Sequence, residues 1–314
     1  MAHHLFSQLG HVELLTTDLE GSVDFFSNIL GLEESAREGD SVYMRCWGEF
    51  HHHSLKLTAS PRSGLGHMAF RTDGADEVDQ VAAIVEPLGL GLGYIDGDVG
   101  HGRAYRFSTP DGHVVEAFWD VDIWEAPPEL QTIHKTRPQK YVTRGASCRR
   151  LDHVTVNCSD PTPSRELFER LGFRTNEIQR FDETKEELFS FLSVSNLAHD
   201  VAFGRDPAGE RGRLNHVCFW EETREEVLRL ADIAADYDVE IEWGPSRHRG
   251  TEIMFLYLRE PGGNRVEICS GGYLVFAPDW KPVEWWVSEH PAIMWSGGIP
   301  DSMYEASPPV GSHD

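Results

Sequence analysis

Four short stretches of the chain begin alike: GHVEL at residues 10–14, GHMAF at 66–70, DHVTV at 152–156 and NHVCF at 215–219. Each stretch places a histidine at the start of a strand-like run, and a segment with apolar residues at helical spacing follows it. Two later stretches also match, TPDGHVVE at 109–116 and EPGGNRVE at 260–267, where a turn leads into a strand that carries a glutamate. This repetition predicts four copies of one supersecondary unit.

The spacing of the repeats pairs the four units into two halves, because His11, His67 and Glu116 recur as His153, His216 and Glu267. We therefore expect an α+β fold of two domains, each made of two βαβββ modules. Residues 1–122 form the N-terminal domain, 123–147 a linker rich in Pro, Lys, Gln and Thr, and 148–275 the C-terminal domain. Residues 276–314 form a tail without apolar periodicity, expected to be ordered and packed over the second half.

Composition excludes several classes of partner. The formal net charge of −24 argues against binding to nucleic acid or to an anionic membrane. No apolar run approaches the roughly 20 residues that span a bilayer, and the first residues lack the features of a signal peptide, so we expect a cytoplasmic protein. The cysteines are odd in number, form no Cys-x-x-Cys pair and are expected to be reduced and structural: Cys46, Cys148, Cys158, Cys218 and Cys269.

Two imidazoles and one carboxylate form the facial triad of non-haem Fe(II) oxygenases, which leaves positions on one side of the metal open for substrate and dioxygen. A lone strand histidine is more often a hydrogen-bonded core residue, but its repetition at equivalent places favours metal binding. Both halves carry a full set, His11, His67 and Glu116 in the first and His153, His216 and Glu267 in the second.

The neighbours of each set favour the second half. His199, His248 and Tyr257 accompany the second set, and Tyr257 lies ten residues before Glu267, whereas Arg106 lies ten residues before Glu116. His53 and His101 lie roughly where counterparts of the other two histidines fall. We expect the run His51–His53 itself to be a partly exposed strand or loop, with adventitious metal binding as an open alternative.

Six stretches carry a resemblance to a known family: LDHV at 151–154, AHDVAF at 198–203, GRLNHVCF at 212–219, GPSRHRG at 244–250, GNRVE at 263–267 and KPVEW at 281–285. With them the chain resembles the type I extradiol dioxygenases of the vicinal oxygen chelate superfamily, and among these the catechol 2,3-dioxygenases. The two-half plan covers nearly the whole chain. One departure is that the first half of this chain keeps its own His11, His67 and Glu116, which leaves a second metal site open.

The resemblance implies a vicinal oxygen chelate (glyoxalase-like) fold with a catalytic second half and a non-catalytic first half. It implies Fe(II) held by His153, His216 and Glu267, and extradiol (meta) cleavage of catechol or a simple alkyl- or halo-catechol with O2 to a 2-hydroxymuconate semialdehyde. His199 would act as acid and base, and His248 and Tyr257 would hydrogen-bond the substrate oxygens. It also implies a homo-oligomer, a homotetramer.

Several alternatives stay open. The same fold supports metal-dependent isomerases and thiol transferases of the glyoxalase kind, although these lack the His199, His248 and Tyr257 trio. The substrate could be a larger catechol such as 2,3-dihydroxybiphenyl or homoprotocatechuate, and manganese could replace iron. A catalytically dead binding protein is a more distant alternative. In the tail, Trp285, Trp286, Ile293 and Trp295 either close the pocket or only pack against the domain or a neighbouring subunit.

Overall fold

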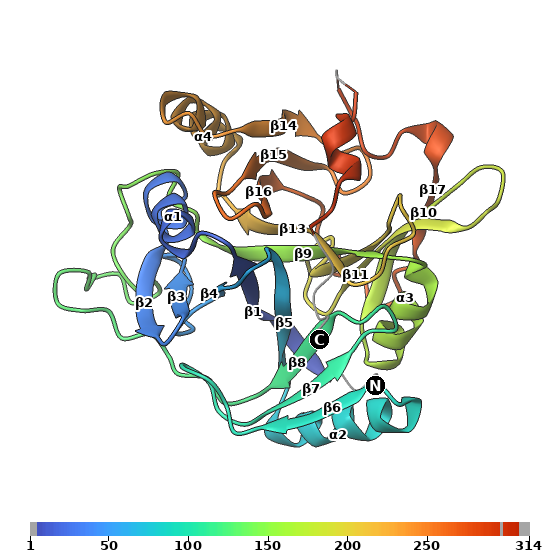
Figure 1. The fold of residues 1–314 in the computed structure, drawn as a ribbon, viewed down its shortest axis with the longest axis horizontal. Coiled ribbons are helices and arrows are strands. Elements are labelled where there is room, and N and C mark those ends of the chain that lie inside the picture. Colours follow the sequence, from blue (N-terminus) through green and yellow to red (C-terminus); the bar gives the residue numbers. More distant parts are fainter. Residues whose placement is uncertain (1–4, 296–297, 308–314) are drawn as a thin grey trace.

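The computed structural model describes residues 5–295 and 298–307, which form one mixed sheet in each half (Figure 1). The first sheet has the order β2 (Glu33–Glu38), β3 (Ser41–Arg45), β4 (Leu55–Ala59), β1 (Phe6–Thr16), β5 (Gly64–Thr72), β8 (Val114–Phe118), β7 (Ala104–Ser108) and β6 (Gly91–Ile95). The second has the order β14 (Ile241–Arg247), β15 (Ile253–Arg259), β16 (Arg265–Gly271), β13 (Arg213–Trp220), β9 (Arg150–Cys158), β12 (Val201–Arg205), β11 (Glu187–Ser193), β10 (Arg174–Arg180) and β17 (Val283–Trp286).

Each sheet is built from two βαβββ modules, and the two sheets have the same strand order when one is read from its opposite end, apart from β17. In both halves the first strands of the two modules lie side by side at the centre, β1 next to β5 and β9 next to β13. The predicted α+β fold with two similar halves is confirmed. The arrangement matters for function because the histidine at the start of each module reaches the centre of its sheet.

One helix follows the first strand of each module: α1 (Leu19–Asp24), α2 (Ala75–Val85), α3 (Pro161–Arg170) and α4 (Arg224–Asp236). Asp18 caps α1 as expected, since its carboxylate accepts a hydrogen bond from the backbone N–H of Gly21 at 3.0 Å. Thr223 and Glu226 form a capping box at the start of α4. The α1 helix widens into a π-helical turn at Phe25–Ile29, and three short 3₁₀ turns lie at Glu86–Leu88, Val287–Glu289 and Asp301–Tyr304.

One large hydrophobic core contains residues of both halves, and aromatic rings meet across the boundary. Phe173 of the second half lies 5.5 Å from Phe6 and 5.1 Å from Phe70 of the first, measured between ring centroids. Phe26 packs in the same way against Phe219 at 5.9 Å. Such contacts add to the free energy gained by burying the rings, so each half stabilises the other.

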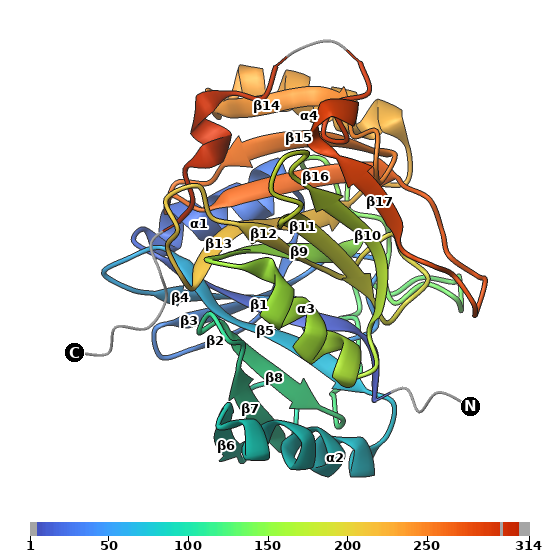
Figure 2. The same cartoon turned by 90° about the vertical axis from the view of Figure 1, so that its right-hand side faces the viewer.

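Part of the tail forms a strand, which the sequence did not indicate. β17 pairs in parallel with β10 and extends the second sheet by one strand, as Figure 2 shows. The strand has only four residues, Val283–Trp286, which is too short for an alternating pattern to be recognised in the sequence. The chain beyond β17 therefore starts from the edge of the second sheet.

Glu177 lies at the junction between β10 and the tail and is paired in register with Val283. The Tyr273 hydroxyl donates a hydrogen bond to its carboxylate at 2.8 Å, and the side chain is buried. Burial raises the pKa of Glu177 to about 7, although the bond from Tyr273 opposes the shift. Between about pH 4.5 and pH 7, the folded protein therefore keeps a proton on the Glu177 carboxyl that the unfolded chain has released.

Replacement of Glu177 by glutamine is expected to stabilise the protein at pH 8 and to have little effect at pH 4.5. With a folded pKa above the unfolded one, the stabilisation from this group is complete below about pH 4.5 and is lost as the pH rises through 7. The gain of Glu177→Gln over the native chain should thus grow with pH, to at most about 3 kcal/mol. Urea unfolding of both proteins at several pH values checks this, and a pH-independent difference would contradict it.

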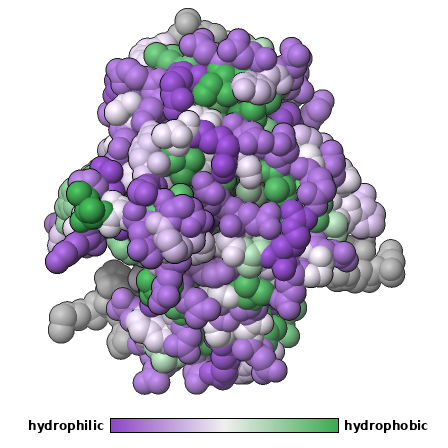
Figure 3. Space-filling view, turned by 90° about the vertical axis from the view of Figure 1, so that its left-hand side faces the viewer, coloured by the Kyte–Doolittle hydropathy of each residue, from purple (hydrophilic) through white to green (hydrophobic). Residues whose placement is uncertain are grey.

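The surface agrees with the acidic composition. The face in Figure 3 is mainly hydrophilic, and apolar residues on it occur in small separate groups. Within the described residues, no helix combines the length and the apolar character needed to cross a membrane.

Candidate metal centre

The second half brings His153, His216 and Glu267 together from three neighbouring strands, β9, β13 and β16. The two Nε2 atoms lie 3.2 Å apart, and Glu267 Oε2 lies 3.2 Å from the first and 2.9 Å from the second. All three side chains are buried. On the other face of β9, Val154 and Val156 pack into the core, as the alternation of the strand predicts.

The donor atoms of this group suit a cation. His216 Nδ1 lies 2.7 Å from Asn215 Oδ1, so Nδ1 carries the proton and Nε2 presents its lone pair to Glu267. Asn157 fixes Asn215 in turn, because its Oδ1 accepts a hydrogen bond from the Asn215 amide at 3.1 Å. The second carboxylate oxygen of Glu267 is buried without a hydrogen-bond partner among the described residues. A divalent ion would satisfy these facing lone pairs, so the residues fit a metal.

The electrostatics also require a positive charge at this position. Burial opposes the charge on Glu267, but the adjacent imidazoles of His153 and His216 hold the pKa of this carboxyl well below its usual range. Burial likewise lowers the pKa of His153, yet the nearby carboxylates of Asp152 and Glu267 outweigh this and raise that pKa to about 9. A buried carboxylate is thus balanced by positive charge, which a bound metal ion also supplies.

Cys218 was not expected at this site. Its sulfur lies in one group with His153 and Glu267, with ligand atoms within 4.8 Å of one another. It follows His216 by two residues on β13, so the strand alternation contained the signal. Burial and the neighbouring Cys269 raise the pKa of the Cys218 thiol well above its usual value, which keeps it protonated and a poor ligand. His216, only 2.9 Å from Glu267, is the better third donor.

The three further predicted residues surround this group. The ring of His199, which precedes β12, lies 3.9 Å from that of His153 between centroids. His248, just after β14, donates from Nδ1 to the carbonyl oxygen of Ala292 at 2.8 Å and therefore accepts at Nε2 from the Tyr257 hydroxyl at 3.2 Å. The carbonyl comes from the tail, a contact that no side-chain pattern indicates.

The protonation of these residues follows from burial. Burial and the nearby His153 lower the pKa of His199 well below its usual value, so the ring is neutral. Its Nδ1 has no hydrogen-bond partner among the described residues and can exchange a proton. Burial and the charge of Glu267 raise the pKa of Tyr257 well above its usual value. Tyr257 therefore keeps its proton and remains a hydrogen-bond donor.

All six residues line one cavity of about 670 Å³. Aromatic and aliphatic side chains form much of its wall, among them Phe189, Phe191, Trp243 and Ile253. The tail contributes Val287, His290, Pro291, Ala292, Ile293, Ile299, Met303 and Tyr304. Of the tail residues singled out in the sequence, Ile293 lines the cavity, whereas Trp285, Trp286 and Trp295 are not among its lining residues.

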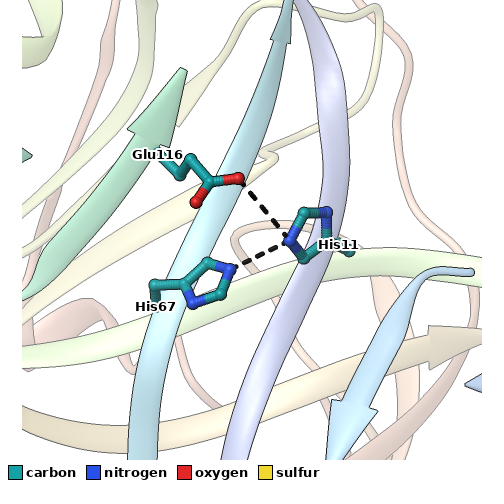
Figure 4. A group of neighbouring side chains, drawn as sticks. All are labelled: His11, His67 and Glu116. Atoms are coloured by element: carbon teal, nitrogen blue, oxygen red, sulfur yellow. Dashed lines mark hydrogen bonds and ion pairs between the residues drawn. The ribbon is translucent and has the colours of Figure 1, made fainter. Parts of the chain in front are cut away.

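The first half assembles its own set as well. His11, His67 and Glu116 extend toward one another from β1, β5 and β8 (Figure 4). The expectation that His51–His53 are partly exposed is correct for His51 and His52 but wrong for His53, which is 4% exposed and lies 4.8 Å from His11 between ring centroids.

All five cysteines are free and buried, as predicted.

The family model of the Glyoxalase/Bleomycin resistance protein/Dioxygenase superfamily matches residues 8–117 and 150–268. These ranges run from β1 to β8 in the first sheet and from β9 to β16 in the second. The chain belongs to this superfamily. A metapyrocatechase of Geobacillus stearothermophilus is 40% identical over 309 residues, which cover 97% of this chain and 94% of the relative. A manganese-dependent 2,3-dihydroxybiphenyl 1,2-dioxygenase of Geobacillus genomosp. 3 is 37% identical over 300 residues, covering 93% and 94%.

Among solved structures, the anaerobic substrate complex of homoprotocatechuate 2,3-dioxygenase from Brevibacterium fuscum, with 3,4-dihydroxyphenylacetate, has a TM-score of 0.86 and 29% identity. The match covers 97% of this chain and 93% of that one. These similarities confirm the vicinal oxygen chelate fold and the prediction of an extradiol dioxygenase. Within this superfamily member, the two groups described above are the candidate metal-binding sites.

Proposed function

We propose that this extradiol dioxygenase cleaves catechol and simple alkyl- or halo-catechols with O2, using Fe(II) held by His153, His216 and Glu267. The observation that carries the proposal is that these three side chains share one cavity with His199, His248 and Tyr257. The expected product is a 2-hydroxymuconate semialdehyde, in which the ring is opened beside the two oxygens and both atoms of O2 are incorporated.

Fe(II) bound by a facial triad supplies Lewis acidity and open positions for a catecholate and dioxygen. The remaining chemistry falls to the side chains. His199, neutral and beside His153, is placed to take a proton from a catechol hydroxyl and to return it later in the reaction. In this structure the one proton of the Tyr257 hydroxyl is donated to Nε2 of His248, and in the substrate complex the phenol, still beside His248, would donate that proton to a substrate oxygen instead.

The cavity favours an uncharged catechol. Arg205 is the one arginine or lysine among the described lining residues. Its three guanidinium nitrogens donate to Glu187 O at 3.0 Å, Ser159 O at 3.0 Å and Asp160 Oδ1 at 3.1 Å. No free guanidinium or ammonium group among these residues remains to pair with a substrate carboxylate, and an unpaired carboxylate in an apolar cavity is unfavourable.

We therefore expect 3,4-dihydroxyphenylacetate to be cleaved with a kcat/KM at least about tenfold below that of 4-methylcatechol, because an unpaired buried polar group costs about 1–3 kcal/mol. The two compounds carry their substituent at the same ring position and differ mainly in charge, which makes the second a matched control. Initial rates of product formation give the ratio. Equal values would contradict the reading of Arg205, and faster cleavage of 2,3-dihydroxybiphenyl than of either would favour the larger-substrate alternative.

Anaerobic reconstitution tests the function as a whole. The metal-stripped chain is loaded with Fe(II) or with Mn(II), since the same ligands suit both, and mixed with catechol in air while the yellow ring-cleavage product is followed by absorbance. Product with Fe(II) supports the proposal, and product with Mn(II) alone would replace iron by manganese. Bound metal without product in either case would reject catechol cleavage. Assembly as a homotetramer stays a prediction, to be checked by light scattering.

A further inference from the structure

The first half contains a second buried group that repeats the geometry of the centre described above (Figure 4). His11 Nε2 lies 2.9 Å from His67 Nε2 and 4.0 Å from Glu116 Oε1. The strand registers also repeat, because His11 is paired with Ala69 as His153 is with Cys218, and Ala69 with Glu116 as Cys218 is with Glu267. The three residues are at most 2% exposed.

The orientation of His67 suits a metal ligand. Its Nδ1 lies 2.8 Å from Glu13 Oε2, so the ring donates its Nδ1 proton to a carboxylate and turns the lone pair of Nε2 toward the group. A carboxylate behind a ligand histidine is a common second layer of zinc sites, where it fixes the ring and makes it a better donor. Glu13 is itself held by Thr58, whose hydroxyl donates to Oε1 at 2.6 Å.

A further imidazole lies beside the three residues whose donor atoms all lie within 4.8 Å of one another. His101 donates from Nδ1 to the carbonyl oxygen of Gly102 at 3.0 Å, which leaves Nε2 as an acceptor. That Nε2 lies 3.3 Å from Glu116 Oε1, and both atoms are buried without a hydrogen-bond partner among the described residues. Two facing acceptors repel each other unless a proton or a metal ion lies between them. The rings of His11 and His101 are 5.3 Å apart between centroids.

Arg106 distinguishes this group from the catalytic one. It is paired in register with Glu116, where Tyr257 is paired with Glu267 in the second half. Its Nε donates to Glu116 Oε2 at 2.8 Å and leaves Oε1 to the histidines. None of His11, His67, His101 and Glu116 is among the residues that line the 670 Å³ cavity. The group therefore lacks both the phenol and a share in the substrate cavity.

We propose that the first half binds a second divalent cation, of the zinc type, through His11, His67, His101 and Glu116. Three imidazoles and one carboxylate make a closed four-donor set, as in structural zinc sites, whereas the second half keeps three donors and an open side for substrate. The ion stabilises the first half by joining three strands and the loop before β7. The proposal does not depend on the identity of the substrate.

Metal counting on two variants tests the proposal. His216→Gln removes the second-half site, and the double variant His216→Gln/His67→Gln also removes a ligand of the first-half site while keeping an amide that can donate to Glu13. Each chain is stripped with a chelator, exposed to excess Zn²⁺, desalted and analysed by mass spectrometry of the elements. We expect two ions per native chain, one in the single variant and none in the double variant.

Thermal unfolding and a Co²⁺ spectrum guard against misfolded variants. Excess Zn²⁺ should raise the Tm of the single variant by at least about 3 °C and leave that of the double variant unchanged, because an ion that binds only the folded state stabilises it. Co²⁺ in the single variant should give the strong visible absorption of four-coordinate cobalt. The proposal is overturned if the single variant binds no ion or gives the weak spectrum of six-coordinate cobalt. It is also overturned if both variants bind equally, as adventitious binding at His51 and His52 would give. Ring cleavage by the native chain is measured separately and fails or succeeds independently.

Discussion

Replacement of His216 by glutamine is expected to abolish ring cleavage, with a fall in kcat/KM of at least about a thousandfold. Loss of a single outer-layer partner of a metal ligand already lowers activity or affinity 10- to 100-fold in metalloenzymes, and His216 would be a direct ligand. Its Nε2 lies 2.9 Å from Glu267 and 3.2 Å from His153, whereas Nε2 of His248 lies 4.0 Å from Glu267 and is bound to Tyr257. Steady-state rates with catechol and the iron content of the same samples check this.

His113→Gln is the matched control for His216→Gln. His113 is also buried, its ring is bound to Thr109 and to the carbonyl oxygen of Arg213, and it is not among the residues that line the cavity. This variant should keep its iron and most of its activity. If His216→Gln retained substantial activity together with bound iron, the assignment of the triad to the second half would be wrong.

Replacement of His199 by glutamine is expected to lower kcat about 10²- to 10⁴-fold while the iron stays bound. Proton transfer by a positioned histidine contributes about this factor, and glutamine cannot accept and return a proton. The ring of His199 is packed between His153 and Phe191, at 3.9 and 5.0 Å between centroids, and the similar volume of glutamine preserves much of that packing. KM for catechol should change far less than kcat.

The repeat supplies the control for His199, because His53 holds the equivalent place beside His11 in the first half. His53→Gln should leave kcat with catechol unchanged within about twofold, the range typical of substitutions away from the chemistry. Iron is counted in both variants by the same method. Loss of iron in His199→Gln in step with activity would make His199 a ligand or a structural support instead of an acid and base.

Much of the fold and the proximity of the candidate residues can be predicted from the sequence because each sequence pattern is repeated along the chain. His153 and His216 open equivalent strands, so the repeat alone predicts that they lie at corresponding places in neighbouring modules. The choice between the halves needed Tyr257, whose counterpart is Arg106. These are side-chain patterns on long strands, which is where periodicity is most informative.

Other parts of the site leave little trace in the sequence. The bond from His248 to Ala292 uses a backbone carbonyl, which every residue has, and β17 is too short to show alternation. A run of three histidines resembles a polar surface segment, which does not indicate that only the last of them, His53, is buried. Tertiary packing decides these features, and local pattern does not record it.

The aromatic contact between the two halves limits how the sequence can evolve. It joins Phe6 and Phe70 to Phe173, and Phe26 to Phe219. A duplicated unit is ordinarily free to drift or to be deleted. Here deletion of the first half would leave the second half with an uncovered aromatic face, which favours aggregation. The aromatic residues at this boundary are therefore constrained in both halves, whatever each half binds.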